Sequence, residues 1–142
     1  MATVQSLIRA YVRTAVKTAT GLDDKHVFSF PNSNVPVELM PCISIFSLSD
    51  KPLNAEDDHQ KPHERLYSFV VDIQVAKSHA EDSTDAMAVQ CRQAILVDDS
   101  LDRNVFSTRW NDQSWGTLTG APSISGTALT FECHYMWYPD NE

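Results

Sequence analysis

Residues 65–77 read RLYSFVVDIQVAK, and this stretch decides the fold because its side chains alternate in character. Apolar side chains recur there at every second position, which places them on one face of a β-strand. They are Tyr67, Phe69, Val71, Ile73 and Val75. The same period returns over residues 128–137. Two long strands, each with one apolar face, need a covering layer of other elements.

A helix over residues 3–20 is the first part of that cover. Apolar residues recur there at steps of three and four, and Gly21 suits the C-terminal cap. Arg9, Arg13 and Lys17 lie four apart on the opposite side. They form either a basic ridge for DNA or an acidic partner, or a solvated helix face. The acidity of the whole chain favours the solvated face.

A second helix is predicted over residues 82–97, after acidic and hydroxyl side chains that suit a helix N-terminus. Its main apolar face carries Met87, Cys91, Ala94 and Ile95. Val89 and Leu96 lie off that face and form a second, smaller patch. The patch indicates a second neighbour, either Val105 and Phe106 of the same chain or another subunit.

The remaining elements complete one domain over residues 1–142. A short strand is predicted at residues 26–30, and another at residues 42–48 directly after Pro41. The element order predicts an α+β fold: a mixed or antiparallel four- to five-stranded sheet with two helices packed on one face.

Residues 50–64, DKPLNAEDDHQKPHE, are dense in charge and interrupted by two prolines, so we predict a mobile polar loop. The loop holds the chain's one cluster of metal-ligating residue types: Glu56, Asp57, Asp58, His59, His63 and Glu64. A metal site needs fixed geometry, which a loop broken by Pro62 does not provide. We therefore predict a solvated loop without a metal ion.

Residues 107–119 are polar but contain Trp110 and Trp115. Tryptophans in such a setting either fill the core or anchor an interface, where large aromatic groups contribute disproportionately to binding. The sequence leaves both interpretations open.

The composition excludes several classes of function. With 19 acidic and 11 basic residues the net charge is −8, which argues against general affinity for nucleic acid or anionic lipid. Three widely spaced cysteines predict buried, reduced thiols and a cytoplasmic origin. The chain has no membrane-spanning run, no glycine-rich phosphate loop and no catalytic motif. We expect neither an enzyme nor a cofactor.

Several segments together resemble the tail-terminator proteins of long-tailed bacteriophages, of the minor tail protein U type. They are the N-terminal amphipathic helix, VPVELMPCISIFSLSD (35–50), the charged loop, RLYSFVVDIQVAKS (65–78), the acid-capped helix and GTALTFECHYMWY (126–138). The resemblance spans nearly all of residues 1–138. Residues 109–116 match it least well.

The resemblance implies a structural virion protein that forms a homohexameric ring, caps the tail tube at its final length and provides the surface for head joining. Its partners would be copies of itself, the tail tube protein and a head-completion or neck protein. It would reside in the virion tail, after assembly in the host cytoplasm. Ring contacts join unlike surfaces, and our candidates for them are Val89, Leu96, Trp110 and Trp115.

Asp57 and Asp58 are candidates for the lumen wall, where carboxylates would let DNA pass without specific binding. Two alternatives remain. One is another head-tail joining, neck or tail-completion protein of the virion. The more distant one is a metal-binding module or hydrolase that uses the cluster at residues 56–64.

Overall fold

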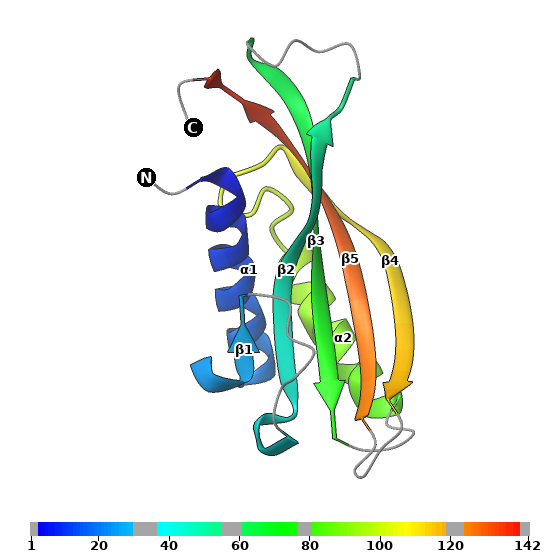
Figure 1. The fold of residues 1–142 in the computed structure, drawn as a ribbon. Coiled ribbons are helices and arrows are strands. Elements are labelled where there is room, and N and C mark those ends of the chain that lie inside the picture. Colours follow the sequence, from blue (N-terminus) through cyan, green and yellow to red (C-terminus); the bar gives the residue numbers. More distant parts are fainter. Residues whose placement is uncertain (1–2, 30–36, 55–60, 77–80, 119–123, 140–142) are drawn as a thin grey trace.

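The computed structural model describes residues 3–29, 37–54, 61–76, 81–118 and 124–139. These residues form two α-helices and five strands (Figure 1). In chain order these elements are α1 (Val4–Thr20), β1 (Val27–Phe28), β2 (Cys42–Pro52), β3 (His63–Val75), α2 (Glu81–Leu96), β4 (Ser107–Leu118) and β5 (Ile124–Trp137). Short 3-10 helices at Asp24–His26 and Val37–Leu39 flank β1 and β2. No helix in the described part of the chain is long and apolar enough to cross a bilayer.

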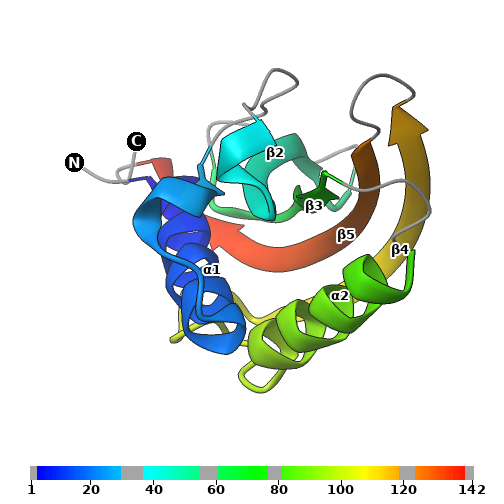
Figure 2. The same cartoon turned by 90° about the horizontal axis from the view of Figure 1, so that it is seen from below.

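The five strands form one sheet in the order β1-β2-β3-β5-β4. β1 runs parallel to β2, and every other neighbouring pair is antiparallel, so the sheet is mixed. Both helices lie on the same side of this sheet (Figure 2). These observations confirm the predicted α+β fold. The stretch at residues 65–77 supplies most of β3, which is the middle strand.

The alternating faces of β3 and β5 lie where the sequence predicts. Four alternate residues on each of the two strands are buried. They are Tyr67, Phe69, Val71 and Ile73 on β3, and Leu129, Phe131, Cys133 and Tyr135 on β5. α1 covers them with Ile8, Val12 and Val16, and α2 does so with Ala88, Cys91 and Ile95. Phe69 and Phe131 are register partners whose rings stack with centroids 5.2 Å apart. This cross-strand pair lies in the hydrophobic core.

α1 has the predicted ends. The Thr3 hydroxyl accepts a hydrogen bond from the backbone N–H of Ser6 at 3.1 Å, which satisfies one free donor of the first turn. Gly21 adopts φ 75° and donates its N–H to the Lys17 carbonyl at 2.9 Å. Glycine suits this left-handed C-terminal position because it has no Cβ to clash.

The basic side of α1 is not the solvated face that the sequence favoured. Arg13 donates to the Val27 carbonyl at 3.0 Å and pairs with Asp24, which also pairs with Lys17. Arg9 donates to Ser47 Oγ at 2.8 Å. The prediction was wrong because β1 and β2 run alongside α1 and bring acceptors to these cations.

The β2–β3 hairpin is longer than predicted. Its strands include Asp50–Pro52 and His63–Glu64, which the sequence assigned to a loop over residues 50–64, and Asp50 is the register partner of Tyr67. The paired ends extend beyond the helices at the top of Figure 1, and we call residues 51–54 and 61–66 the hairpin arm. Residues 55–60, including Asp57 and Asp58, lie outside the described residues. The predicted strand at 26–30 is reduced to Val27–Phe28.

Candidate interaction surface

β4 is the long edge strand of the sheet. It has twelve residues, pairs with β5 on one side, and has no strand on its other side among the described residues. An open edge presents unpaired backbone N–H and C=O groups that another chain can use. The other end of the sheet differs, because β1 is only two residues long.

Trp110 and Trp115 both lie on the helix-bearing side of this edge strand. Their register partners on β5 are the buried residues Phe131 and Thr127. Side chains five positions apart on a regular strand point to opposite faces. Here a register shift between Trp110 and Asp112 adds one residue, which restores both indoles to the same face.

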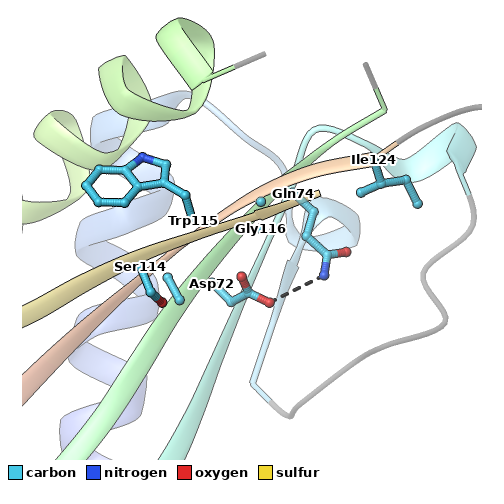
Figure 3. Close-up of a pocket in the computed structure, with 8 residues that line it drawn as sticks. Asp72, Gln74, Ser114, Trp115, Gly116 and Ile124 are labelled. Carbon is cyan, nitrogen blue, oxygen red and sulfur yellow. Dashed lines mark hydrogen bonds between the residues drawn. The ribbon is translucent and has the colours of Figure 1, made fainter. Parts of the chain in front are cut away.

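Two charged residues of α2 hold the indoles in place. Trp115 Nε1 donates to Asp85 Oδ1 at 2.8 Å, and the Arg92 guanidinium carbon lies 4.2 Å from the centre of the Trp110 ring. The second contact is a cation–π interaction. Figure 3 shows Trp115 directed toward the helices, on the opposite side of the sheet from Ser114.

Val89 joins this group because it follows Asp85 by four residues and precedes Arg92 by three, a spacing that puts all three on one face of α2. We call Val89, Trp110 and Trp115 the tryptophan edge. Their exposed fractions are 38%, 39% and 52%. Neither indole is therefore a core plug in the isolated chain. The structure brings three of the predicted interface residues together.

The tryptophan edge is hollowed between its two indoles. A notch of about 400 Å³ is lined by both tryptophans and by Asn111, Asp112 and Gln113. Rigid aromatic side chains beside a notch are typical of interface residues that dominate binding energy, because little side-chain entropy is lost on contact. The surface can therefore accept a side chain or a strand from a partner.

Leu96 follows Val89 by seven residues, so the two lie on the same side of α2, two turns apart. Leu96 is half-buried and packs against the core, whereas Val89 is exposed. The second neighbour of α2 is chiefly α1, which lies beside it on the same side of the sheet (Figure 2). Val105 is buried in the core, whereas Phe106 is exposed.

The structure describes only part of the predicted metal-ligating cluster. Residues 56–59 lie outside the described residues, and His63 and Glu64 are part of β3. His63 Nδ1 lies 2.8 Å from the Lys61 carbonyl, and its Nε2 lies 2.9 Å from Arg65 Nη1. Both ring nitrogens are thus engaged within the protein. No group of three potential metal ligands exists in the part of the chain that the structure describes.

The base of the hairpin arm contains a polar cluster that sequence reasoning missed. Asp50 accepts from Arg65 Nε at 2.6 Å and from the Tyr135 hydroxyl at 2.6 Å, and Gln5 also donates to it. Burial, together with the bond to Asp50, raises the pKa of Tyr135. The cluster joins α1, β2, β3 and β5. No local pattern signals it, because its members are distant in sequence.

The three cysteines are buried and free, as predicted. Burial raises the pKa of Cys42 and of Cys133 to about 11 and that of Cys91 to about 12. These thiols therefore stay protonated at neutral pH. Because the thiolate is the nucleophilic form, none of them is suited to covalent catalysis.

Comparisons with known proteins were made at the levels of sequence and fold. No family model matches the chain, and no curated protein matches it in sequence. A chain of the solved structure described as "Virion of native gene transfer agent (GTA) particle" matches the fold with a TM-score of 0.59 and 13% sequence identity. The match covers 91% of this chain and 94% of that one. The two chains share a fold over almost their whole length.

Proposed function

We propose that this protein is a non-enzymatic structural subunit of a phage-like virion. The supporting observation is the shared fold with a chain of the gene transfer agent virion, because it covers almost all of both chains. The buried cysteines, whose thiols stay protonated, agree with a non-enzymatic role. The resemblance of the sequence to tail-terminator proteins points to the same class.

We further propose that copies of the chain form a homohexameric ring that caps the tail tube at its final length. Such a ring requires two unlike surfaces, because each subunit meets its neighbour head to tail. Among the described residues, the sheet has two unlike open edges. One is β4 with the tryptophan edge, and the other is the part of β2 that follows Ser44, where the pairing with β1 ends.

The proposed partners are the tail tube protein on one side of the ring and a head-completion or neck protein on the other. The net charge of −8 suits a ring through which DNA passes, since an acidic wall repels phosphate. A different head-tail joining protein of the virion is the second candidate. The fold match supports this second candidate as much as it supports the tail-tube cap, because the matched chain belongs to the structure of a whole virion.

The first experiment is a measurement of assembly. Purified protein at increasing concentration is analysed by light scattering and by negative-stain electron microscopy. We expect closed rings, and we expect tubes of the tail tube protein from the same genome to stop growing when the ring is added. A chain that remains monomeric at high concentration would contradict the ring. A ring that leaves tube growth unchanged would favour the second candidate.

Alanine at both Trp110 and Trp115 is expected to raise the concentration needed for half-assembly by about 30-fold or more. Removing a residue that dominates an interface costs at least about 2 kcal/mol, and about 1.4 kcal/mol corresponds to tenfold. Light scattering across a dilution series measures the change. The fold should persist, because both indoles are exposed.

The matched control is Val97→Ala, which removes an apolar side chain that is 83% exposed and lies outside the tryptophan edge. It should assemble like the wild-type protein. If the double variant also assembled like the wild type, the ring contact would lie elsewhere on the molecule.

A further inference from the structure

The outer side of the sheet, away from the helices, has a hollow near the C-terminal end of β3 (Figure 3). Its volume is about 310 Å³, at the lower end of the range for small-molecule sites. Small residues of β4 and β5 form its floor, beside two longer polar side chains of β3. The lining includes Asp72, Gln74, Ser114, Gly116, Gly126 and Ala128.

The registers of three strands bring these residues together. Asp72 is the partner of Ala128, which is in turn the partner of Ser114. Gln74, Gly126 and Gly116 form the next row in the same way. In both rows the residues on β5 and β4 are small, and the longer side chains of Asp72 and Gln74 lie beside them on β3.

Asp72 is the charged residue among those that line the hollow. Its Oδ2 accepts a hydrogen bond from Gln74 Nε2 at 3.3 Å (Figure 3). No lysine, arginine or histidine among the described residues forms an ion pair with it. Burial raises the pKa of Asp72, because it disfavours the charged form of the carboxyl group.

The two glycines keep the space beside the carboxylate open. A Cβ at Gly126 would lie 3.9 Å from Asp72 Oδ1, in contact with the carboxylate. A Cβ at Gly116 would meet no atom within 4 Å. Any other residue at either position would occupy part of the hollow.

We propose that this hollow binds the guanidinium group of an arginine side chain presented by a different protein, with the Asp72 carboxylate as its ionic partner. A planar guanidinium fits a shallow, flat floor and can donate two parallel hydrogen bonds to one carboxylate. The net charge of −8 attracts a basic partner at long range. The site goes beyond the proposed ring and does not depend on it.

The test uses the full chain labelled with nitrogen-15 and the tripeptide acetyl-Gly-Arg-Gly-amide. Amide shifts of Gly116 and Gly126 are followed by NMR during the titration. We expect saturable shifts, and we expect the citrulline peptide, a neutral mimic of arginine, to bind at least about tenfold more weakly because it lacks the charge. Equal binding of both peptides, or no saturable shift with arginine, would overturn the proposal. Equal binding of the lysine peptide would overturn the choice of guanidinium.

Three variants locate the site. Asp72→Asn should weaken binding at least about tenfold, because it removes the charge without changing the shape. Gly116→Val should also weaken it by filling the hollow. Asp99→Asn removes an exposed carboxylate outside the hollow and should leave binding within about twofold. If Asp99→Asn weakened binding as much as Asp72→Asn, the attraction would be general and the site would be rejected.

The fold of Asp72→Asn is checked by thermal unfolding. Because burial raises the pKa of Asp72 above its unfolded value, the ionised side chain costs stability once the pH exceeds the folded pKa, and this cost disappears as the pH falls. The asparagine variant should therefore be at least as stable as the wild type at neutral pH. These measurements need no ring, so a failure of ring assembly leaves their outcome unchanged.

Discussion

Replacing Phe131 with alanine is expected to lower the free energy of unfolding by about 3–5 kcal/mol. Phe131 is fully buried, and its ring stacks on Phe69 of the neighbouring strand. The substitution removes this contact and leaves a cavity that the surrounding strands can close only in part. Urea denaturation at neutral pH, followed by far-ultraviolet circular dichroism, measures the loss.

Phe106→Ala is the matched control, since the same side chain is removed from a position that is 57% exposed. Its effect should stay below about 1 kcal/mol, as for most surface substitutions. Losses of similar size in both variants would show that Phe131 is not at the centre of the core. The alternation of β3 and β5 would then need a different register.

Asp50→Ala should lower the free energy of unfolding by about 2–3 kcal/mol, the second largest expected effect. Asp50 and Arg65 each have side chains that are 20% exposed, so alanine leaves the Arg65 cation half-buried without its partner. The Tyr135 hydroxyl loses its acceptor in the same substitution. The loss is measured by urea denaturation, and hydrogen exchange should show faster exchange at the backbone amides of the hairpin arm.

Asp24→Ala provides the comparison for an ion pair at the surface. The Asp24 side chain is 74% exposed, and water competes for its contacts with Arg13 and Lys17. Its removal should change stability much less than Asp50→Ala does. An equal effect of the two substitutions would show that the cluster at the base of the hairpin arm adds no more than a surface pair.

The candidate site was only partly predictable. Val89, Trp110 and Trp115 were candidates from the sequence, because each is a large apolar group in polar surroundings. The sequence did not predict that the two tryptophans lie on the same face of β4, because this depends on the register shift after Trp110. Leu96 lies seven residues after Val89 on the same side of α2, but it is half-buried against the core, whereas Val89 is exposed.

The sequence by itself determined the central strands, the two helices and the covered face of the sheet. These follow from periods of two and 3.6 residues, which reflect backbone geometry and need no information from distant residues. Only the tertiary structure decided the hairpin arm, the tryptophan edge, the Asp50 cluster and the hollow at Asp72. Each depends on which strands become neighbours and in which register. Asp50 on β2 and Tyr135 on β5, for example, are 85 positions apart in the sequence. They meet because both strands pair with β3.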